Sequence, residues 1–213
     1  LTLCDHITGH LSSCFVNPQD LESFPRPAWE LMSPSPYACL LTSRGCPFHC
    51  NYCAHDILAP GYRRRSWMDV FNEMEYSYKK GIRTFVFYDD ALLITPEKMI
   101  IPLMEEVIKR NWEITFHTPN GLHVREITPD VASLMYRSGF KTIRISLESN
   151  RIDIQKASDL KATNTQFIMA CQALHQAGFS TKDIGVYLLA MLPGQHFREV
   201  EEAIRFVISN GAY

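Results

Sequence analysis

The sequence has no long hydrophobic run, no strong excess of charge of one sign, and none of the common nucleophile or phosphate-binding motifs. Its 213 residues contain no stretch near the roughly 18 to 20 apolar residues that cross a bilayer. A formal net charge of −2 gives no overall attraction to nucleic acid or to an anionic membrane surface. No Ser–His–Asp arrangement and no glycine-rich phosphate loop can be recognised. We therefore expect neither a membrane nor nucleic acid as a partner.

Cysteine is present in a number that argues against disulfides. The seven cysteines are an odd number, in a chain too large to need disulfide staples and without a secretory signal at its start. We therefore expect reduced thiols and a cytoplasmic protein.

Three of these cysteines, Cys46, Cys50 and Cys53, lie within eight positions of the segment TSRGCPFHCNYCAHD (42–56), spaced C-x3-C-x2-C. A structural zinc site normally takes four protein ligands, and the nearby His49 lies inside the loop with little freedom to fold back. An iron–sulfur cluster is the other choice for soft thiolate ligands. Three thiolates on a cubane cluster leave one iron without a protein ligand, open to substrate.

Residues 1–36 and 37–213 differ in their pattern. The first part carries five prolines among polar residues and is predicted to be an extended linker. The second part alternates short apolar runs with amphipathic segments. The predicted strands cover 37–43, 82–90, 112–118, 141–149 and 183–192, and the predicted helices cover 66–81, 95–111, 128–139, 164–178 and 198–211. Ser66, Thr95 and Thr128 are the predicted caps of the first three helices.

This alternation of about five strand–helix units predicts an α/β fold with parallel strands and helices outside. A doubly wound open sheet and an α/β barrel both satisfy it. In either fold, ligands bind at the carboxyl ends of the strands. The three cysteines come directly after the first strand, which places them on that functional face.

The cysteine spacing, the aromatic Tyr52 before the third cysteine and the preceding strand together resemble the radical S-adenosylmethionine (SAM) superfamily. The resemblance covers residues 37–213. It implies a partial (β/α) barrel that binds a 4Fe–4S cluster through Cys46, Cys50 and Cys53. The open iron would chelate SAM, whose reductive cleavage gives a deoxyadenosyl radical. It also implies an electron donor such as flavodoxin or ferredoxin, and a small-molecule or peptide substrate.

A finer resemblance is to the cobalamin-dependent subgroup of that superfamily. The linker motif of the subgroup is matched by Phe24, Pro25, Pro27, Ala28 and Trp29, and its arginine-rich turn by Arg63 and Arg65. Its strand-end motifs are matched by Asp89–Asp90 and by Glu148–Ser149. The resemblance implies that a cobalamin-binding domain precedes the linker, and that cobalamin serves a methylation or a related radical modification. The arginine run is otherwise read as a solvated turn.

Several polar residues at strand ends are predicted to contact the cofactor. The second strand ends in a pair of aspartates, the fourth in Glu-Ser, and a lysine precedes the next helix. A carboxylate at the end of an apolar strand is costly unless it is partnered, which favours a cofactor contact. The predicted cofactor-binding residues are Tyr52, Asp89, Asp90, Ser146, Glu148 and Lys161. His117 and Asn120 are as consistent with a substrate contact as with a core or loop position.

The chain departs from the subgroup at a few positions. Asn150 and Gln195 stand where glycine and glutamate are usual, and five units are present where six are usual. We expect a sixth strand after Tyr213, because the fifth strand would otherwise leave an apolar edge unpaired.

Two other functions fit the cysteines. A methylthiotransferase acting on transfer RNA would share the cluster loop but not the Pro-Ala-Trp linker. A non-catalytic zinc-binding module would leave the five-unit fold without a purpose.

Overall fold

The computed structural model describes residues 3–4, 11–12, 21–28, 36–157, 161–192 and 194–213. Its strands are β1 (Leu3–Cys4), β2 (Leu11–Ser12), β3 (Ala38–Leu40), β4 (Ser43–Arg44), β5 (Arg63–Arg64), β6 (Thr84–Phe87), β7 (Thr115–His117), β8 (Leu122–His123), β9 (Phe140–Glu148) and β10 (Ile184–Leu188). Its α-helices are α1 (His55–Leu58), α2 (Trp67–Lys79), α3 (Ile100–Lys109), α4 (Pro129–Ser138), α5 (Ile152–Ala157), α6 (Asn164–Ala177) and α7 (Phe197–Ser209). No helix in these ranges is long and apolar enough to cross a membrane.

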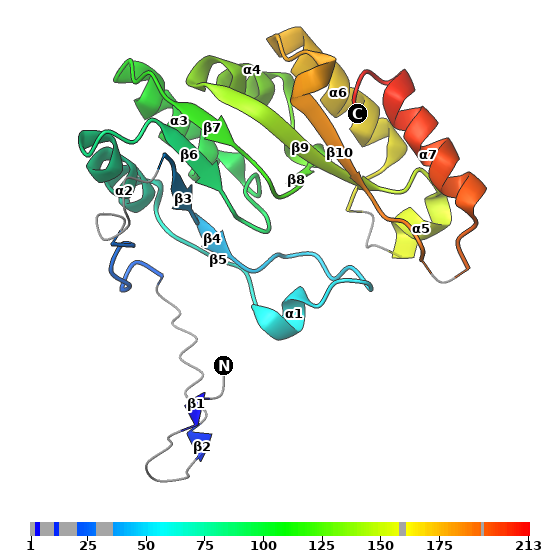
Figure 1. The fold of residues 1–213 in the computed structure, drawn as a ribbon, viewed down its shortest axis with the longest axis horizontal. Helices are drawn as coiled ribbons and strands as arrows, with labels where there is room; N and C mark the ends of the chain where they lie inside the picture. The colour runs from blue at the N-terminus through cyan, green and yellow to red at the C-terminus, as the bar shows by residue number, and fades with distance from the viewer. Residues whose placement is uncertain (1–2, 5–10, 13–20, 29–35, 158–160, 193) are drawn as a thin grey trace.

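The main sheet has the strand order β10-β9-β7-β6-β3, and every pair along this path is parallel. The order follows the chain without a reversal, as in a barrel, whereas a doubly wound sheet reverses its order at a switch point. The helices that connect these strands lie along one face of the sheet (Figure 1). The predicted partial barrel with helices outside is therefore confirmed.

The core lies between this sheet and the helices. Phe87 on β6, Phe116 on β7 and Phe140 on β9 are buried. The Phe87 ring stacks on Phe116 with centroids 5.4 Å apart, and the Phe140 ring is tilted against Phe116 with centroids 5.0 Å apart. The alternate residues of the same strands, among them His117, point to the opposite, concave face. The His117 Nδ1 atom lies 2.8 Å from the Thr142 hydroxyl there.

Most helix ends follow from local sequence. Ser66 and Thr128 cap α2 and α4 by accepting a hydrogen bond from the backbone N–H three residues on. Gly139 ends α4 in the left-handed conformation. The predicted cap Thr95 is wrong, because its hydroxyl is engaged by the Arg64 guanidinium and by its own neighbour's carbonyl. A separate 3-10 turn (Pro96–Lys98) therefore precedes α3.

Four of the five predicted strands are shorter than the patterns indicated, namely those at 37–43, 82–90, 112–118 and 183–192. The run at 37–43 breaks after Leu40, and Ser43–Arg44 instead pairs antiparallel with β5. The run at 112–118 loses its first residues because Trp112 stacks on Tyr78 of α2, with ring centroids 4.3 Å apart. The periodicity did not predict β5, β8, α1 and α5, nor the antiparallel pair β1–β2 in the segment expected to be an extended linker.

The outer edge of β10 is partly paired in this structure. The Tyr213 N–H donates to the Ile184 carbonyl over 3.0 Å, and the Val186 N–H donates to the Tyr213 carbonyl over 2.7 Å. The predicted bare edge is wrong at these two positions. The sixth strand expected after Tyr213 stays a prediction.

The linker is described only in part, and its Trp29 lies outside the described residues. Leu21 is buried, the Glu22 carboxylate accepts a hydrogen bond from the Ser66 N–H, and the Arg26 guanidinium lies 3.5 Å from the Tyr76 ring centroid. Residues 21–28 are thus attached to α2 rather than forming a free spacer.

Candidate functional site

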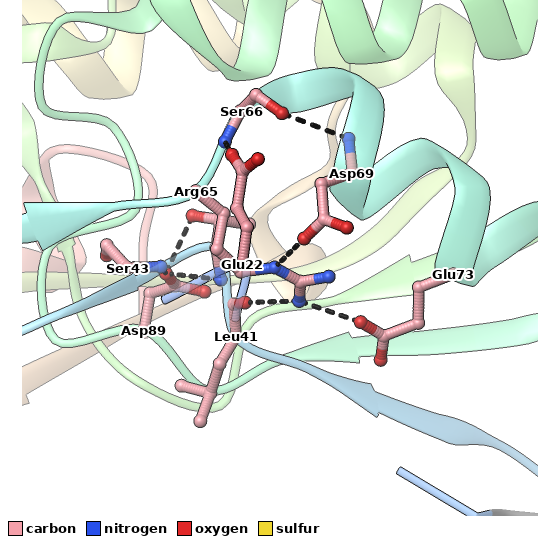
Figure 2. A network of polar contacts seen from close by, with 9 residues as sticks. Glu22, Leu41, Ser43, Arg65, Ser66, Asp69, Glu73 and Asp89 are labelled. Atoms are coloured by element: carbon pink, nitrogen blue, oxygen red, sulfur yellow. Dashed lines mark hydrogen bonds and ion pairs between the residues drawn. The ribbon is translucent and has the colours of Figure 1, made fainter. Parts of the chain in front are cut away.

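The cysteine loop begins where β3 ends, and a buried carboxylate fixes its first residues. Asp89 is 3 % exposed, and its Oδ1 accepts hydrogen bonds from the backbone N–H and the hydroxyl of both Thr42 and Ser43, over 2.6 to 2.9 Å. Burial raises the pKa of Asp89 to about 6, although these four hydrogen bonds favour the charged form. Asp89 therefore joins the end of β6 to the base of the loop (Figure 2).

The other end of the loop is fixed by Arg65, at the start of α2. Its guanidinium contacts the Asp69 carboxylate at 2.6 Å, the Glu73 carboxylate at 2.7 Å and the Leu41 carbonyl at 3.0 Å (Figure 2). The Glu73 side chain is 3 % exposed, so its charge depends on Arg65. Arg65 is thus a structural ion-pair partner, and the predicted solvated turn is wrong at this residue.

The loop itself closes tightly between these two anchors. Gly45 has φ +81°, and a Cβ there would lie 2.2 Å from the Gly61 carbonyl oxygen, so only glycine fits directly before Cys46. The Cys53 N–H donates to the Cys50 carbonyl over 2.9 Å. Cys50 is buried, Cys46 half-buried and Cys53 exposed. Figure 1 shows this loop, with α1, at the same end of the sheet as α5.

Neighbouring groups both raise and lower the pKa of two of the loop thiols, which bind metal only in the deprotonated form. Burial raises the pKa of Cys46 and of Cys50, while the positive charge of Lys161 lowers both. A hydrogen bond with the Tyr52 side chain lowers the pKa of Cys50 further. The buried Cys171 has its pKa raised to about 12 by burial alone, as expected for an inert packed thiol.

A single metal ion and a cubane cluster place different demands on the three thiols. Among the residues that the structure describes, no three His, Cys, Asp or Glu side chains converge closely enough to hold one metal ion. A cubane cluster makes a different demand, because each cysteine binds a separate iron at its own corner.

Glu148 and Lys161 form an ion pair on the same rim. The Lys161 Nζ lies 3.1 Å from Glu148 Oε1, and both side chains are mostly buried. Glu148 has φ +68°, a left-handed conformation that is costly for a residue with a side chain. The β9–β10 pairing also shifts register here, since Leu188 pairs with Glu148 directly after Tyr187 has paired with Ser146. Strain of this kind is typical of functional positions.

The remaining predicted residues divide into two groups. Asp90 is exposed and lies close enough to Cys46 for its charge to raise the pKa of that thiol. Ser146 is buried beside Gly121, where an added Cβ would lie 2.0 Å from its Oγ. Asn120 instead supports the backbone, because its Nδ2 donates to the Tyr88 carbonyl over 2.9 Å. The predicted residues around the cysteine loop are thus Tyr52, Asp90, Glu148 and Lys161. Asn120 instead binds the backbone at the end of β6.

Sequence reasoning missed the residues beneath the loop. Phe48, between the first two cysteines, packs on the His123 ring with centroids 4.6 Å apart, and the Arg125 guanidinium lies 4.6 Å from the Phe48 ring centroid. His123 and Arg125 come from β8 and the 3-10 turn that follows it. The sequence around His123 gave no indication of a functional role, because the strand that positions it, β8, has only two residues and so shows no periodicity.

The model of the radical SAM superfamily matches residues 40–207. The chain belongs to this superfamily. The predicted superfamily is confirmed, and the partial barrel agrees with it.

Similar proteins include methyltransferases. An uncharacterized methyltransferase of Pyrococcus horikoshii is 24% identical over 200 residues, covering 88% of this chain and 42% of the relative. The hopanoid C-2 methylase of Rhodopseudomonas palustris is 26% identical over 141 residues, covering 61% and 26%. The chain thus spans less than half the length of these curated relatives.

A solved structure shares the fold. TsrM from Kitasatospora setae, a radical SAM methyltransferase solved with cobalamin and a [4Fe-4S] cluster bound, superposes with a TM-score of 0.70. The identity is 16%, and the match covers 82% of this chain and 34% of TsrM. The predicted cobalamin-dependent subgroup is thus represented among the similar proteins.

Proposed function

We propose that this chain is the radical domain of a cobalamin-dependent enzyme that methylates its substrate, or modifies it by related radical chemistry. The observation that carries the proposal is the cysteine loop on the first strand end of a partial barrel, facing the strained Glu148–Lys161 pair. The methyltransferase names of the curated relatives and the cobalamin bound in TsrM support the subgroup.

In this proposal Cys46, Cys50 and Cys53 hold the 4Fe–4S cluster as thiolates. The positive charge of Lys161, which lowers the pKa of Cys46 and Cys50, stabilises the deprotonated thiols. When bound and reduced, the cluster supplies the electron that cleaves SAM to a deoxyadenosyl radical. The protein's own contribution is to bind, to orient and to exclude water.

The rim residues recognise SAM through charge. Its amino group suits the carboxylates of Asp90 and Glu148, and its carboxylate suits the Lys161 ammonium. Glu148 and Lys161 already pair at 3.1 Å, so each keeps a partner before SAM arrives. Tyr52 and Ser146 complete the predicted contacts. The Oδ1 atom of Asp89 holds Thr42 and Ser43 at the base of the loop, and its Oδ2 atom makes no hydrogen bond in the described residues.

The partners follow from the same chemistry. The cluster needs a one-electron donor such as flavodoxin or ferredoxin, and a cytoplasmic location is consistent with reduced thiols. The substrate is proposed to be a small molecule or a peptide, because the net charge of −2 gives no attraction to nucleic acid.

Electron paramagnetic resonance tests the cofactor assignment. SAM should perturb the signal of the reduced cluster and should be cleaved to 5′-deoxyadenosine. Asp90→Ala and Glu148→Ala should keep the cluster but weaken the response to SAM, with the larger effect at Glu148. Unchanged SAM affinity in both variants would remove these carboxylates from the site. A signal that ignores SAM in the wild type would refute the proposed function.

A further inference from the structure

His123 is a buried histidine, and neither of its ring nitrogens makes a hydrogen bond of ordinary length and angle among the described residues, although the Asp90 backbone lies near enough to act on the ring. It is 1 % exposed, on β8, where it pairs in register with Ser146 of β9. Buried polar atoms without partners are rare in native proteins, because each loses its hydrogen bonds to water without compensation. An unpartnered imidazole in a well-packed rim therefore calls for a group that binds there.

The ring lies directly under the cysteine loop. Its centroid is 4.6 Å from that of Phe48, which stands between Cys46 and Cys50 in the sequence, and Arg125 contacts the same phenyl ring. Phe48 is thereby held by two residues from one short segment, 123–125. Any cofactor that the loop binds through its thiolates is brought to the neighbourhood of this histidine.

The charges around His123 keep the ring neutral. Burial, and the nearby positive charges of Lys161 and Arg125, lower the pKa of His123 to about 3, against a smaller opposite effect of the Asp90 backbone. A neutral imidazole has one N–H donor and one acceptor nitrogen. In an environment that already contains two cations, the N–H suits an anionic acceptor.

We propose that His123 is a positioning residue of the loaded site, which donates an N–H hydrogen bond to an anionic acceptor that arrives with the cofactors. That acceptor is a sulfur of the cluster or the carboxylate of SAM. The inference rests on the proposed function, since both acceptors belong to it. Hydrogen bonds to cluster sulfurs raise the reduction potential, because they stabilise the extra negative charge of the reduced state.

The melting temperature of the apoprotein distinguishes a positioning role of His123 from a purely structural one. Replacing a structural, hydrogen-bonded histidine lowers the melting temperature, whereas replacing an unpartnered one with an apolar ring of similar size leaves it unchanged or raises it. His123→Phe keeps the stack on Phe48 and removes only the N–H. His123→Asn loses the stack but keeps a donor. The two variants separate the hydrogen bond from the packing.

The experiment compares wild type, His123→Phe, His123→Asn and a control, His175→Gln, in the anaerobically reconstituted protein. His175 lies on α6, where its nitrogens contact the Phe179 and Gly211 carbonyls, at 3.0 and 2.9 Å. For each protein we would measure the apoprotein melting temperature, the cluster midpoint potential with and without SAM, and the SAM dissociation constant.

We expect His123→Phe to keep the apoprotein melting temperature and to shift the midpoint potential to more negative values. A shift without SAM assigns the acceptor to a cluster sulfur. A shift that needs SAM, with an affinity loss of several-fold, assigns it to the SAM carboxylate. His123→Asn should lie nearer to wild type, and His175→Gln should lower only the melting temperature.

An unchanged potential and SAM affinity in His123→Phe, with a wild-type cluster, would overturn the inference. A His123→Phe apoprotein that melts well below wild type would also overturn it, because the ring nitrogens would then already have partners in the apoprotein. A wild type that binds no cluster would instead refute the proposed function itself.

Discussion

The two sides of the cysteine loop differ in how their polar groups are satisfied. On the α2 side, Asp89 accepts four hydrogen bonds and Arg65 holds two carboxylates and a carbonyl. On the β9 side, Glu148 has a left-handed backbone and His123 is buried. Most polar groups on the first side are paired within the protein, although Asp89 Oδ2 makes no hydrogen bond in the described residues, whereas on the second side neither ring nitrogen of His123 makes one. This difference separates the residues that build the loop from those expected to serve its cofactors.

The largest effect on stability is expected at Arg65. Arg65→Met leaves the Glu73 carboxylate buried without its cation, which should lower the free energy of unfolding by about 3–5 kcal/mol. Urea denaturation measures the loss. The double variant Arg65→Met/Glu73→Leu should recover much of it. The control Arg205→Met breaks an exposed pair with Glu201 and should cost less than about 1 kcal/mol. Equal losses in the two single variants would contradict the structural assignment.

The next effect is expected at Asp89. Asp89→Ala leaves the Thr42 and Ser43 donors without an acceptor, which should cost about 2–4 kcal/mol. Hydrogen exchange at those two amides should accelerate together. The neighbouring Asp90→Ala is the matched control, because Asp90 is exposed. If Asp90→Ala destabilises the fold as much as Asp89→Ala, the division of labour between the two aspartates is wrong.

A smaller loss of stability, joined to a loss of function, is expected at Lys161. Lys161→Met leaves the mostly buried Glu148 carboxylate without its cation, at a cost of about 1–3 kcal/mol in the free energy of unfolding. The variant should also weaken SAM binding, which Arg65→Met should not do once the protein is folded. Calorimetric titration of SAM into the reconstituted variants measures the difference. Normal SAM affinity in Lys161→Met would place the lysine on the structural side of the comparison.

The smallest effect is expected where the linker meets α2. Glu22 accepts a hydrogen bond from the Ser66 N–H at the helix N-terminus, an exposed contact worth about 0.3–1 kcal/mol. Glu22→Gln should lower stability by no more than that, and added salt should reduce the difference. A larger loss would mean that the linker contributes to the fold beyond this one contact.

The sequence predicted those features that depend on local signals. The Thr-Pro pair at the start of α4 and the glycine at its end are sufficient to predict both ends of the helix, because caps act within one turn. The cysteine loop was recognisable from spacing. Thr95 resembled the same cap, but a distant arginine, Arg64, takes its hydroxyl. Tertiary contacts of this kind cannot be derived from a local pattern.

The site was predictable only in part, for the same reason. Glu148 was found because a carboxylate ending an apolar strand is costly, and Lys161 is the partner that lowers this cost. Arg65 was misread because its partner Glu73 is two helical turns away, inside a segment that was assigned correctly. His123 was missed because its position depends on β8, which pairs with β9 through only two residues.

Iron and sulfide analysis of the anaerobically reconstituted protein tests the central assignment most directly. The account predicts about four irons and four sulfides per chain, with a brown absorbance that dithionite bleaches. Alanine at Cys46, Cys50 or Cys53 should abolish the cluster, whereas alanine at the half-buried Cys39 or the buried Cys171 should not. Recovery of zinc without sulfide, or a full cluster in any of the three loop variants, would contradict it.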